Sequence, residues 1–374
     1  MVKKTKYIYI FFLCKLIELK EYFETMKRSF NYQQQKKINF TLKIRERLKE
    51  LPPYVGKYAR GIEPLTSDNT RYSYLSDLQV FFYFLISSKP EFVDCTMKDV
   101  TLEYLEELTI FDIEEYQEYL KFYCSPTGQW YQNGERGVAR KIASLRSFFY
   151  YLHQHDLITK NPMLKVSTPK IHEKEIIHLD EEEIVALIEH IKNANIRYKS
   201  NRKRDIAITI LLLGTGIRVS ECVGLDIDDV DFINERIRVI RKGGNEMYVY
   251  FGEEVKETLE DYLKERQLLL EQIPEEKALF LSRRKKRISV DAIEELVKNY
   301  SKEVITRKTI TPHKLRSTYG TRLYEETGDI YIVADALGHK DINTTSRHYA
   351  AIQDKRRREA AKAFRIQKKD DNSL

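Results

Sequence analysis

Histidine, arginine and tyrosine residues recur at short intervals in the last quarter of the chain, and together they could act on a phosphodiester. His313 and Arg316 stand three residues apart, which would place them on one face of a helix. His339 follows a glycine, and Tyr349 comes ten residues later. Arginine offers phosphate oxygens a planar fork of donors, histidine can donate a proton, and tyrosine can act as a covalent nucleophile. These residue types favour a phosphodiester as the substrate.

Two cations further upstream could join this group. Arg218 follows the segment G-T-G-I at the expected start of a short helix, and Lys242 precedes two glycines at the tip of an expected hairpin. Thr311 can cap a helix whose first residue is Pro312, because a missing N–H costs nothing at that position. The sequence therefore predicts a helix for the histidine–arginine pair and separate turns for the two upstream cations.

Each of these residues also has an ordinary structural interpretation when it is considered alone. Arg218 could form a surface ion pair, Lys242 could be a solvated hairpin residue, and His339 could cap a helix. Tyr349 could belong to the core, as most of the 25 tyrosines would. Their occurrence together and in this order favours a shared site.

Composition bounds the class of protein. The 374 residues favour two domains, and 42% hydrophobic with 32% charged residues describes a soluble globular chain. The net charge of +7 permits nucleic-acid binding without establishing it. Four scattered cysteines, with no C-x-x-C pair, predict a reducing cytoplasm, no disulfide framework and no zinc ribbon.

The N-terminus has a basic start and a short apolar run that ends at Lys15. No small-residue cleavage site follows, and the run is too short to span a bilayer. We expect residues 1–25 to be a disordered or partly helical extension, or a consequence of start-site choice, with Met26 as the alternative start. No membrane association is expected.

Apolar periodicity predicts a mainly α protein with a small antiparallel β-meander, in two domains. The first domain covers residues 26–165, a polar, proline-containing linker covers 166–176, and the second domain covers 177–374. Expected helices of the first domain lie at residues 42–51, 70–86, 112–123 and 138–153, with a polar loop at 128–137. Expected strands of the second domain lie at residues 230–232, 236–241 and 247–251.

The C-terminal half resembles the tyrosine recombinase (phage integrase) family, and within it the Xer-type enzymes, most of all the one-component XerS branch. The similarity covers residues 179–351 and extends more loosely upstream through L-P-P-Y-V at 51–55. It implies a helical core-binding domain followed by a mixed α/β catalytic domain. The motifs that carry it are T-G-I-R-V-S-E (215–221), R-K-G-G (241–244), T-P-H-K-L-R (311–316), L-G-H-K (337–340) and T-T-S-R-H-Y (344–349).

The resemblance implies a role for each of six catalytic residues. Tyr349 would attack the scissile phosphate and form a 3′-phosphotyrosyl bond, while Arg218 and Arg316 would clamp the non-bridging oxygens. Lys242 would protonate the departing 5′-oxygen. His313 would assist proton transfer at the tyrosine, and His339 would hydrogen-bond the phosphate. Glu221 is expected to orient Arg218 or His313.

The same resemblance bears on cofactors and partners. A phosphotyrosyl bond conserves the energy of the diester, so no ATP is needed. The cationic residues would take the place of a metal, and no cofactor is expected. The partners would be double-stranded DNA, three further copies of the chain in a tetramer on two sites, and a DNA translocase. The C-terminal helix would dock into a neighbouring subunit. Predicted DNA contacts are the basic side chains Arg140, Lys141, Arg146, Arg202, Lys203 and Arg204.

Several functions remain open from the sequence. The leading one is a cytoplasmic site-specific recombinase that resolves chromosome dimers at a dif-like site during chromosome segregation. An integrase or excisionase of a mobile element or phage would use the same chemistry. A type IB topoisomerase would share the active site, and a DNA-binding protein with an inactive site is the non-enzymatic alternative.

Overall fold

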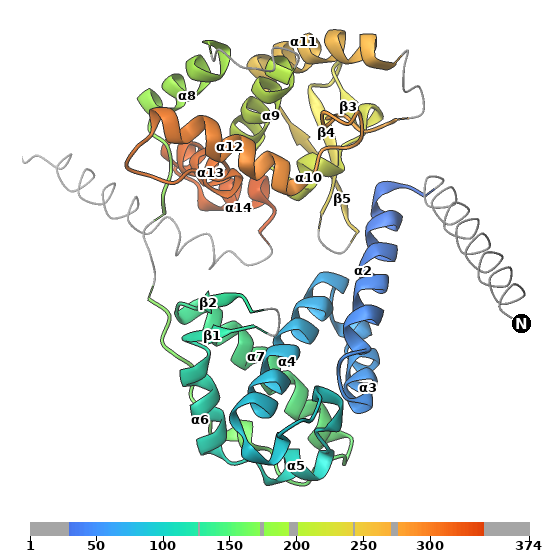
Figure 1. Cartoon of the computed structure of the whole chain (residues 1–374). Coiled ribbons are helices and arrows are strands. Elements are labelled where there is room, and N and C mark those ends of the chain that lie inside the picture. The colour runs from blue at the N-terminus through green and yellow to red at the C-terminus, as the bar shows by residue number, and fades with distance from the viewer. Residues whose placement is uncertain are drawn as a thin grey trace, which may run out of the picture. The chain divides into compact units, whose positions relative to one another are not determined.

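The chain divides into two compact units, residues 1–173 and 174–374. The computed structural model describes residues 30–125, 128–172, 176–193, 201–241, 244–270 and 276–339 (Figure 1). The division falls within the stretch 166–176 that was expected to be a linker. The N-terminal extension 1–25 lies outside the described residues. Within those ranges, every helix is too short or too polar to cross a membrane.

The N-terminal unit is built from helices around an aromatic core. Its main helices are α2 (Tyr32–Leu48), α3 (Pro53–Gly61), α4 (Asp68–Ser88), α5 (Leu102–Glu107), α6 (Ile110–Tyr119) and α7 (Glu135–Gln154). Short 3-10 turns occupy Glu63–Leu65, Pro90–Phe92, Met97–Asp99 and Pro162–Leu164. Helix α4 packs against both α2 and α7. Phe81 and Phe148 are among the buried rings between them, and edge-to-face contacts such as Phe82 against Phe148 at 6.1 Å fix their orientation.

A two-stranded hairpin in this unit corrects the sequence prediction. The helix expected over 112–123 ends at Tyr119, and the loop expected over 128–137 contains a strand. Strands β1 (Phe122–Cys124) and β2 (Trp130–Gln132) pair antiparallel. Aromatic residues prefer extended backbone, and here the Phe122 and Trp130 rings stack at 5.0 Å across the pair.

The C-terminal unit combines helices with the predicted meander. Strands β3 (Val230–Asp231), β4 (Arg236–Ile240) and β5 (Glu246–Tyr250) form an antiparallel sheet in that order, which confirms the mainly α fold with a small β-meander. The helices are α8 (Glu181–Asn193), α9 (Arg202–Thr215), α10 (Val219–Gly224), α11 (Glu253–Leu270), α12 (Val290–Val304), α13 (Pro312–Thr327) and α14 (Ile330–Leu337), with a 3-10 turn at Ile227–Asp229.

Helix α9 is the centre of this unit. It packs against α8, α11 and α13, and Figure 1 shows those helices on different sides of it. Ile208, Leu211 and Leu212 are fully buried in these contacts. After its charged first turn, α9 is mostly apolar and buried, and its packing places its C-terminal end next to α13.

Candidate active site

Helix α13 positions His313 and Arg316, as the sequence predicts. Thr311 is the extended residue before the helix, and Pro312 is its first residue, but the Thr311 side chain does not make the expected capping hydrogen bond. His313 is exposed, whereas Arg316 is only 4% exposed. The backbone N–H of Leu179 donates to the hydroxyl of Thr318 at 2.9 Å, which ties α13 to the start of the unit.

The guanidinium of Arg316 lies between the C-terminal ends of two helices. Its Nη1 donates to the carbonyl of Gly216 at 2.5 Å, and its Nη2 donates to the carbonyl of Leu337. Gly216 ends α9 and Leu337 is the last residue of α14. Helix C-termini carry negative partial charge, so this position stabilises the buried cation.

Two glycines make that arrangement possible. Gly216 and Gly338 each adopt φ of +60°, the left-handed conformation that ends a helix and that glycine adopts without strain. After Gly338, the backbone N–H of His339 donates to the carbonyl of Ala334 at 2.9 Å. This cap fixes the half-buried His339 at the end of α14.

Arg218 reaches the same helix end from the start of α10. Its backbone N–H and its Nη1 donate to the two carboxylate oxygens of Glu221, at 2.9 and 2.8 Å. Its Nη2 lies 3.5 Å from the carbonyl of Gly338. Glu221 thus orients Arg218, one of the two partners expected for it from the sequence.

A third arginine, which sequence analysis did not include among the site residues, completes the cluster. Nη2 of Arg241 donates to the carbonyl of Ala336 at 3.0 Å. Three consecutive carbonyls at the C-terminal end of α14 and its glycine cap therefore each accept from a different arginine. The carbonyl of Ala336 faces Arg241, that of Leu337 faces Arg316, and that of Gly338 faces Arg218.

This cluster can bind an anion. A guanidinium has five N–H donors in a rigid fork that suits phosphate, and two of these forks converge where His339 and the helix of His313 also lie. Arg241 belongs to the motif R-K-G-G, but the neighbouring residues in the sequence do not distinguish a site arginine from a solvated one. Lys242 and Tyr349 lie outside the described residues, so their predicted roles stay predictions.

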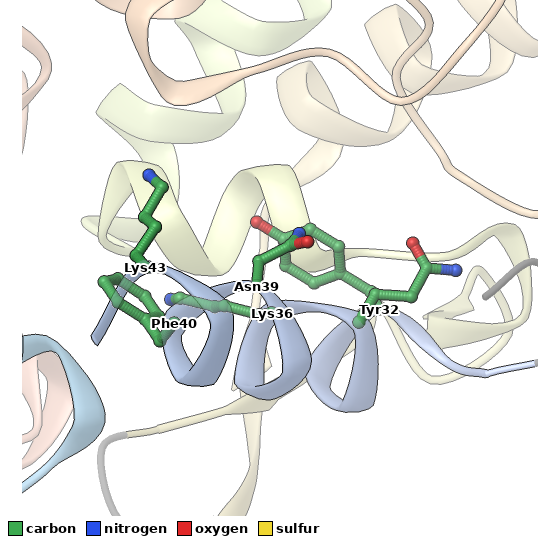
Figure 2. A pocket seen from close by; sticks show the side chains of 6 residues that line it. Tyr32, Lys36, Asn39, Phe40 and Lys43 are labelled. Carbon is green, nitrogen blue, oxygen red and sulfur yellow. The ribbon is translucent and has the colours of Figure 1, made fainter. Parts of the chain in front are cut away.

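Two shallow pockets lie away from this cluster. One, of about 210 Å³, lies along α2 and is lined by residues between Tyr32 and Lys43 (Figure 2). The other, of about 130 Å³, lies beside α9 and includes Ile184 and Val255. Within the described ranges no three histidine, cysteine or acidic side chains gather as a metal site.

The basic residues of α7 predicted to contact DNA have protein partners. Lys141 is 7% exposed, and both it and Arg140 contact Asp77 of α4, with Arg140 donating through both Nη atoms at 2.5 and 2.7 Å. Arg146 donates to the carbonyl of Val166 at 3.0 Å. Arg140 keeps about half of its side chain exposed, so it is the better candidate for a phosphate contact.

The three basic residues at the start of α9, Arg202 to Arg204, also differ in exposure. Arg204 is 8% exposed and binds Asp205 and the carbonyl of Leu281. Its partner Asp205 is buried too, and burial raises the pKa of that carboxyl while Arg204 opposes the rise. Lys203 is exposed and Arg202 is half-buried. Of the three, Lys203 can most readily reach a phosphate.

Comparison with known proteins places the chain among recombinases. Residues 178–356 match the sequence model of the Phage integrase family. The chain is 35% identical over 303 residues to tyrosine recombinase XerC of Caldanaerobacter subterraneus subsp. tengcongensis, covering 79% of this chain and 81% of the relative. It is 30% identical over 343 residues to tyrosine recombinase XerS of Lactococcus lactis (strain IL1403), covering 83% and 96%.

Solved structures share the fold. XerH recombinase bound to palindromic difH substrate in a post-cleavage complex has a TM-score of 0.59 at 18% identity, over 82% of this chain and 94% of that chain. The Tn1549 transposon integrase, in complex with circular intermediate DNA, has a TM-score of 0.56 at 22% identity, over 78% and 93%. At these identities the likeness concerns architecture alone.

Proposed function

Because this chain belongs to the phage integrase family, as a tyrosine recombinase of the Xer type, we propose that it resolves chromosome dimers at a dif-like site. Enzymes of this kind cut and rejoin DNA at defined sites. The single observation that carries the active-site assignment is the convergence of Arg218 and Arg316 on adjacent carbonyls at the end of α14.

In the proposed reaction the two arginines bind the non-bridging oxygens of the scissile phosphate. Negative charge on those oxygens grows in the transition state, and donors that are already oriented stabilise it without reorganising. The carboxylate of Glu221 and the helix ends around Arg316 supply that orientation. His339, fixed by the cap of α14, would donate a further hydrogen bond to the phosphate.

The proton transfers require residues on both sides of the phosphorus. The hydroxyl of Tyr349 would attack, and its proton would leave with help from His313, since a free tyrosine has a pKa of about 10. The bond to the 5′-oxygen would break, and Lys242 would protonate that oxygen. The products are a 3′-phosphotyrosyl enzyme and a 5′-hydroxyl strand, and strand rejoining is the reverse.

Substrate and partners follow from the same proposal. Duplex DNA would be contacted by the exposed cations, among them Arg140 and Lys203, with phosphate contacts supplying most of the affinity. Recombination between two sites requires four copies of the chain. A chromosomal role in the cytoplasm would also bring in a DNA translocase.

Integration or excision of a mobile element is the second candidate. The architecture is shared with the Tn1549 transposon integrase, so fold alone does not separate the two roles. The relatives at 30–35% identity carry Xer names, which favours the chromosomal role. Binding of the purified protein to chromosomal fragments distinguishes them, because the chromosomal role predicts a single strong site outside any mobile element.

Covalent trapping tests the chemistry. A nicked duplex that loses a short fragment after cleavage should leave the wild-type protein linked to DNA. Tyr349→Phe should bind the same duplex and form no adduct. An adduct formed by Tyr349→Phe, or none formed by the wild type on a site that it binds, would overturn the proposal.

A further inference from the structure

We propose that Arg241 is a positioning residue of the recombination reaction, which fastens the β4–β5 hairpin to the end of α14 and so holds Lys242 at the departing 5′-oxygen. This inference rests on the proposed role of Lys242. Arg241 itself would touch neither the phosphate nor the leaving group.

The backbone of Arg241 is held by the hairpin. Its N–H donates to the carbonyl of Asn245 at 2.8 Å, and its carbonyl accepts from the N–H of Gly244 at 3.0 Å. These bonds continue the ladder in which Ile240 pairs with Glu246. The anchor therefore directly follows the last residue pair of the sheet, and Lys242 is the next residue in the sequence.

The side chain of Arg241 leaves the hairpin and crosses to α14. Its Nη2 donates to the carbonyl of Ala336 at 3.0 Å, a contact between residues 95 apart in sequence. The C-terminus of α14 also receives Arg218 and Arg316. The hairpin and the two arginines proposed to bind phosphate are thus all hydrogen-bonded to the same helix end.

Gly338 is shaped to receive this side chain. A Cβ added at Gly338 would lie 1.2 Å from Nη1 of Arg241 and 2.2 Å from its Cζ. The guanidinium therefore packs directly on the backbone of Gly338, in space that any other residue would fill. Glycine is required here for the φ of +60° and also for the close approach.

The polar atoms of Arg241 argue for a role beyond packing. Its Nε and Nη1 are buried and have no hydrogen-bond partner among the described residues. Burial lowers the pKa of Arg241, with Glu221 opposing and the charge of Arg218 adding to the decrease. Two buried N–H donors without partners are unfavourable for stability, so an apolar side chain of similar length would serve a purely structural contact better.

The two unpartnered atoms also separate positioning from phosphate binding. Nη2 of Arg241 donates to the carbonyl of Ala336, and Nε and Nη1 are buried, so the side chain serves the contact with α14. A rigid anchor is valuable here, because a general acid displaced by about 1 Å can lose on the order of 10²-fold in rate. The geometry therefore points to Arg241 acting through Lys242.

A change of leaving group tests this inference. In DNA whose scissile 5′-bridging oxygen is replaced by sulfur, the thiolate departs without a proton, since thiols are far more acidic than alcohols. On ordinary DNA we expect Lys242→Ala to slow cleavage by about 10²-fold or more, as for loss of a general acid. Arg241→Met should slow it by roughly tenfold to 10²-fold. On the sulfur substrate, both variants should cleave within about threefold of the wild type if only the acid is impaired.

The possible results distinguish the role of Arg241 from the role of Lys242 on which it depends. If Lys242→Ala is rescued by sulfur and Arg241→Met is not, Arg241 acts on the phosphate and the inference is wrong while Lys242 keeps its role. If Lys242→Ala is not rescued, the role of Lys242 is wrong and the inference falls with it. Arg241→Lys, which keeps the charge and a shorter reach, provides the same comparison if Arg241→Met does not fold.

Gly338→Ala provides an independent test from the other side of the contact. It should displace Arg241 and reproduce the sulfur-rescued defect. Gly128→Ala is the matched control, because Gly128 also has a positive φ, of +78°, but has no atom within 4 Å of the added Cβ. Normal cleavage of ordinary DNA by Gly338→Ala would overturn the proposed anchor.

Discussion

Arg218 and Glu221 form a closed pair at the start of α10, in which one carboxylate accepts both the backbone N–H and the Nη1 of the arginine. The carboxylate is 4% exposed, while 39% of the Arg218 side chain is exposed. The buried carboxylate of Glu221 thus fixes the Arg218 side chain on one side and leaves its other side exposed to a ligand. This pair links the cap of a short helix to the chemistry proposed for the site.

Removing the carboxylate should impair cleavage more than binding. We expect Glu221→Ala to lower the cleavage rate by about tenfold to 10²-fold, because Arg218 loses its orientation. Loss of the cap should also lower the free energy of unfolding by about 1–2 kcal/mol. Glu221→Gln keeps an acceptor for the backbone N–H and should recover most of the stability but less of the rate. Equal rates for Glu221→Ala and the wild type in a trapping assay would contradict the orienting role.

Arg316→Lys should be far from conservative. A lysine cannot bridge the carbonyls of Gly216 and Leu337 and also present a planar fork to phosphate. We expect cleavage to fall by about 10²–10³-fold, as when an oriented transition-state donor is lost. Single-turnover cleavage at saturating protein measures this directly. A loss of affinity with an unchanged rate would mean that Arg316 binds the ground state only.

Two neighbours at the start of α9 should behave differently when mutated. Lys203→Ala should reduce the slope of log affinity against log salt by about 1, as for one lost phosphate contact. Arg204→Met should leave that slope unchanged and lower the free energy of unfolding by roughly 3–5 kcal/mol, because Asp205 would remain buried without its cationic partner and keep only the hydrogen bond from the Tyr300 hydroxyl. Titrations at several salt concentrations, together with urea unfolding, check both. The reverse pattern would place Arg204 at the DNA.

The β3–β4 turn predicts a specific pH dependence of stability. Hydrogen bonds from the side chain and backbone of Asn234, with a further contribution from Arg236, lower the pKa of Asp231 from 3.8 to about 2. The folded state therefore holds this carboxylate ionised more strongly than the unfolded chain does. Its contribution is complete above about pH 4 and is lost as the pH falls to about 2. Wild type should exceed Asp231→Asn in stability at neutral pH, and urea unfolding should show the difference closing below pH 4. A difference that stays constant down to pH 2 would contradict the assignment.

Local signals in the sequence predicted the framework of the site well. The Thr311–Pro312 start of α13 and the alternation in β4 and β5 depend on near neighbours, and both were found where expected. Away from the site, the β1–β2 hairpin of the N-terminal unit was not predicted. The spacing of Tyr119 and Tyr123 fits a helix, and only the cross-strand pairing of Tyr123 with Tyr131 decides for a strand.

Contacts between distant segments could not be predicted in this way. The basic face of α7 was predicted to contact DNA, but Asp77, 63 residues upstream, is the partner of Arg140. Likewise, the place of Arg241 depends on a carbonyl of α14 and on the absence of a Cβ at Gly338. Such roles follow from packing between elements, which residue spacing does not encode.

The identity of the nucleophile is the most direct test of this account. The wild-type protein, trapped on a nicked duplex, should be digested with trypsin and its DNA-linked peptide sequenced by mass spectrometry. The nucleotide remnant should be on the peptide of residues 348–355, attached to Tyr349 through a 3′-phosphate. A remnant on any other tyrosine, or a linkage through a 5′-phosphate, would contradict it.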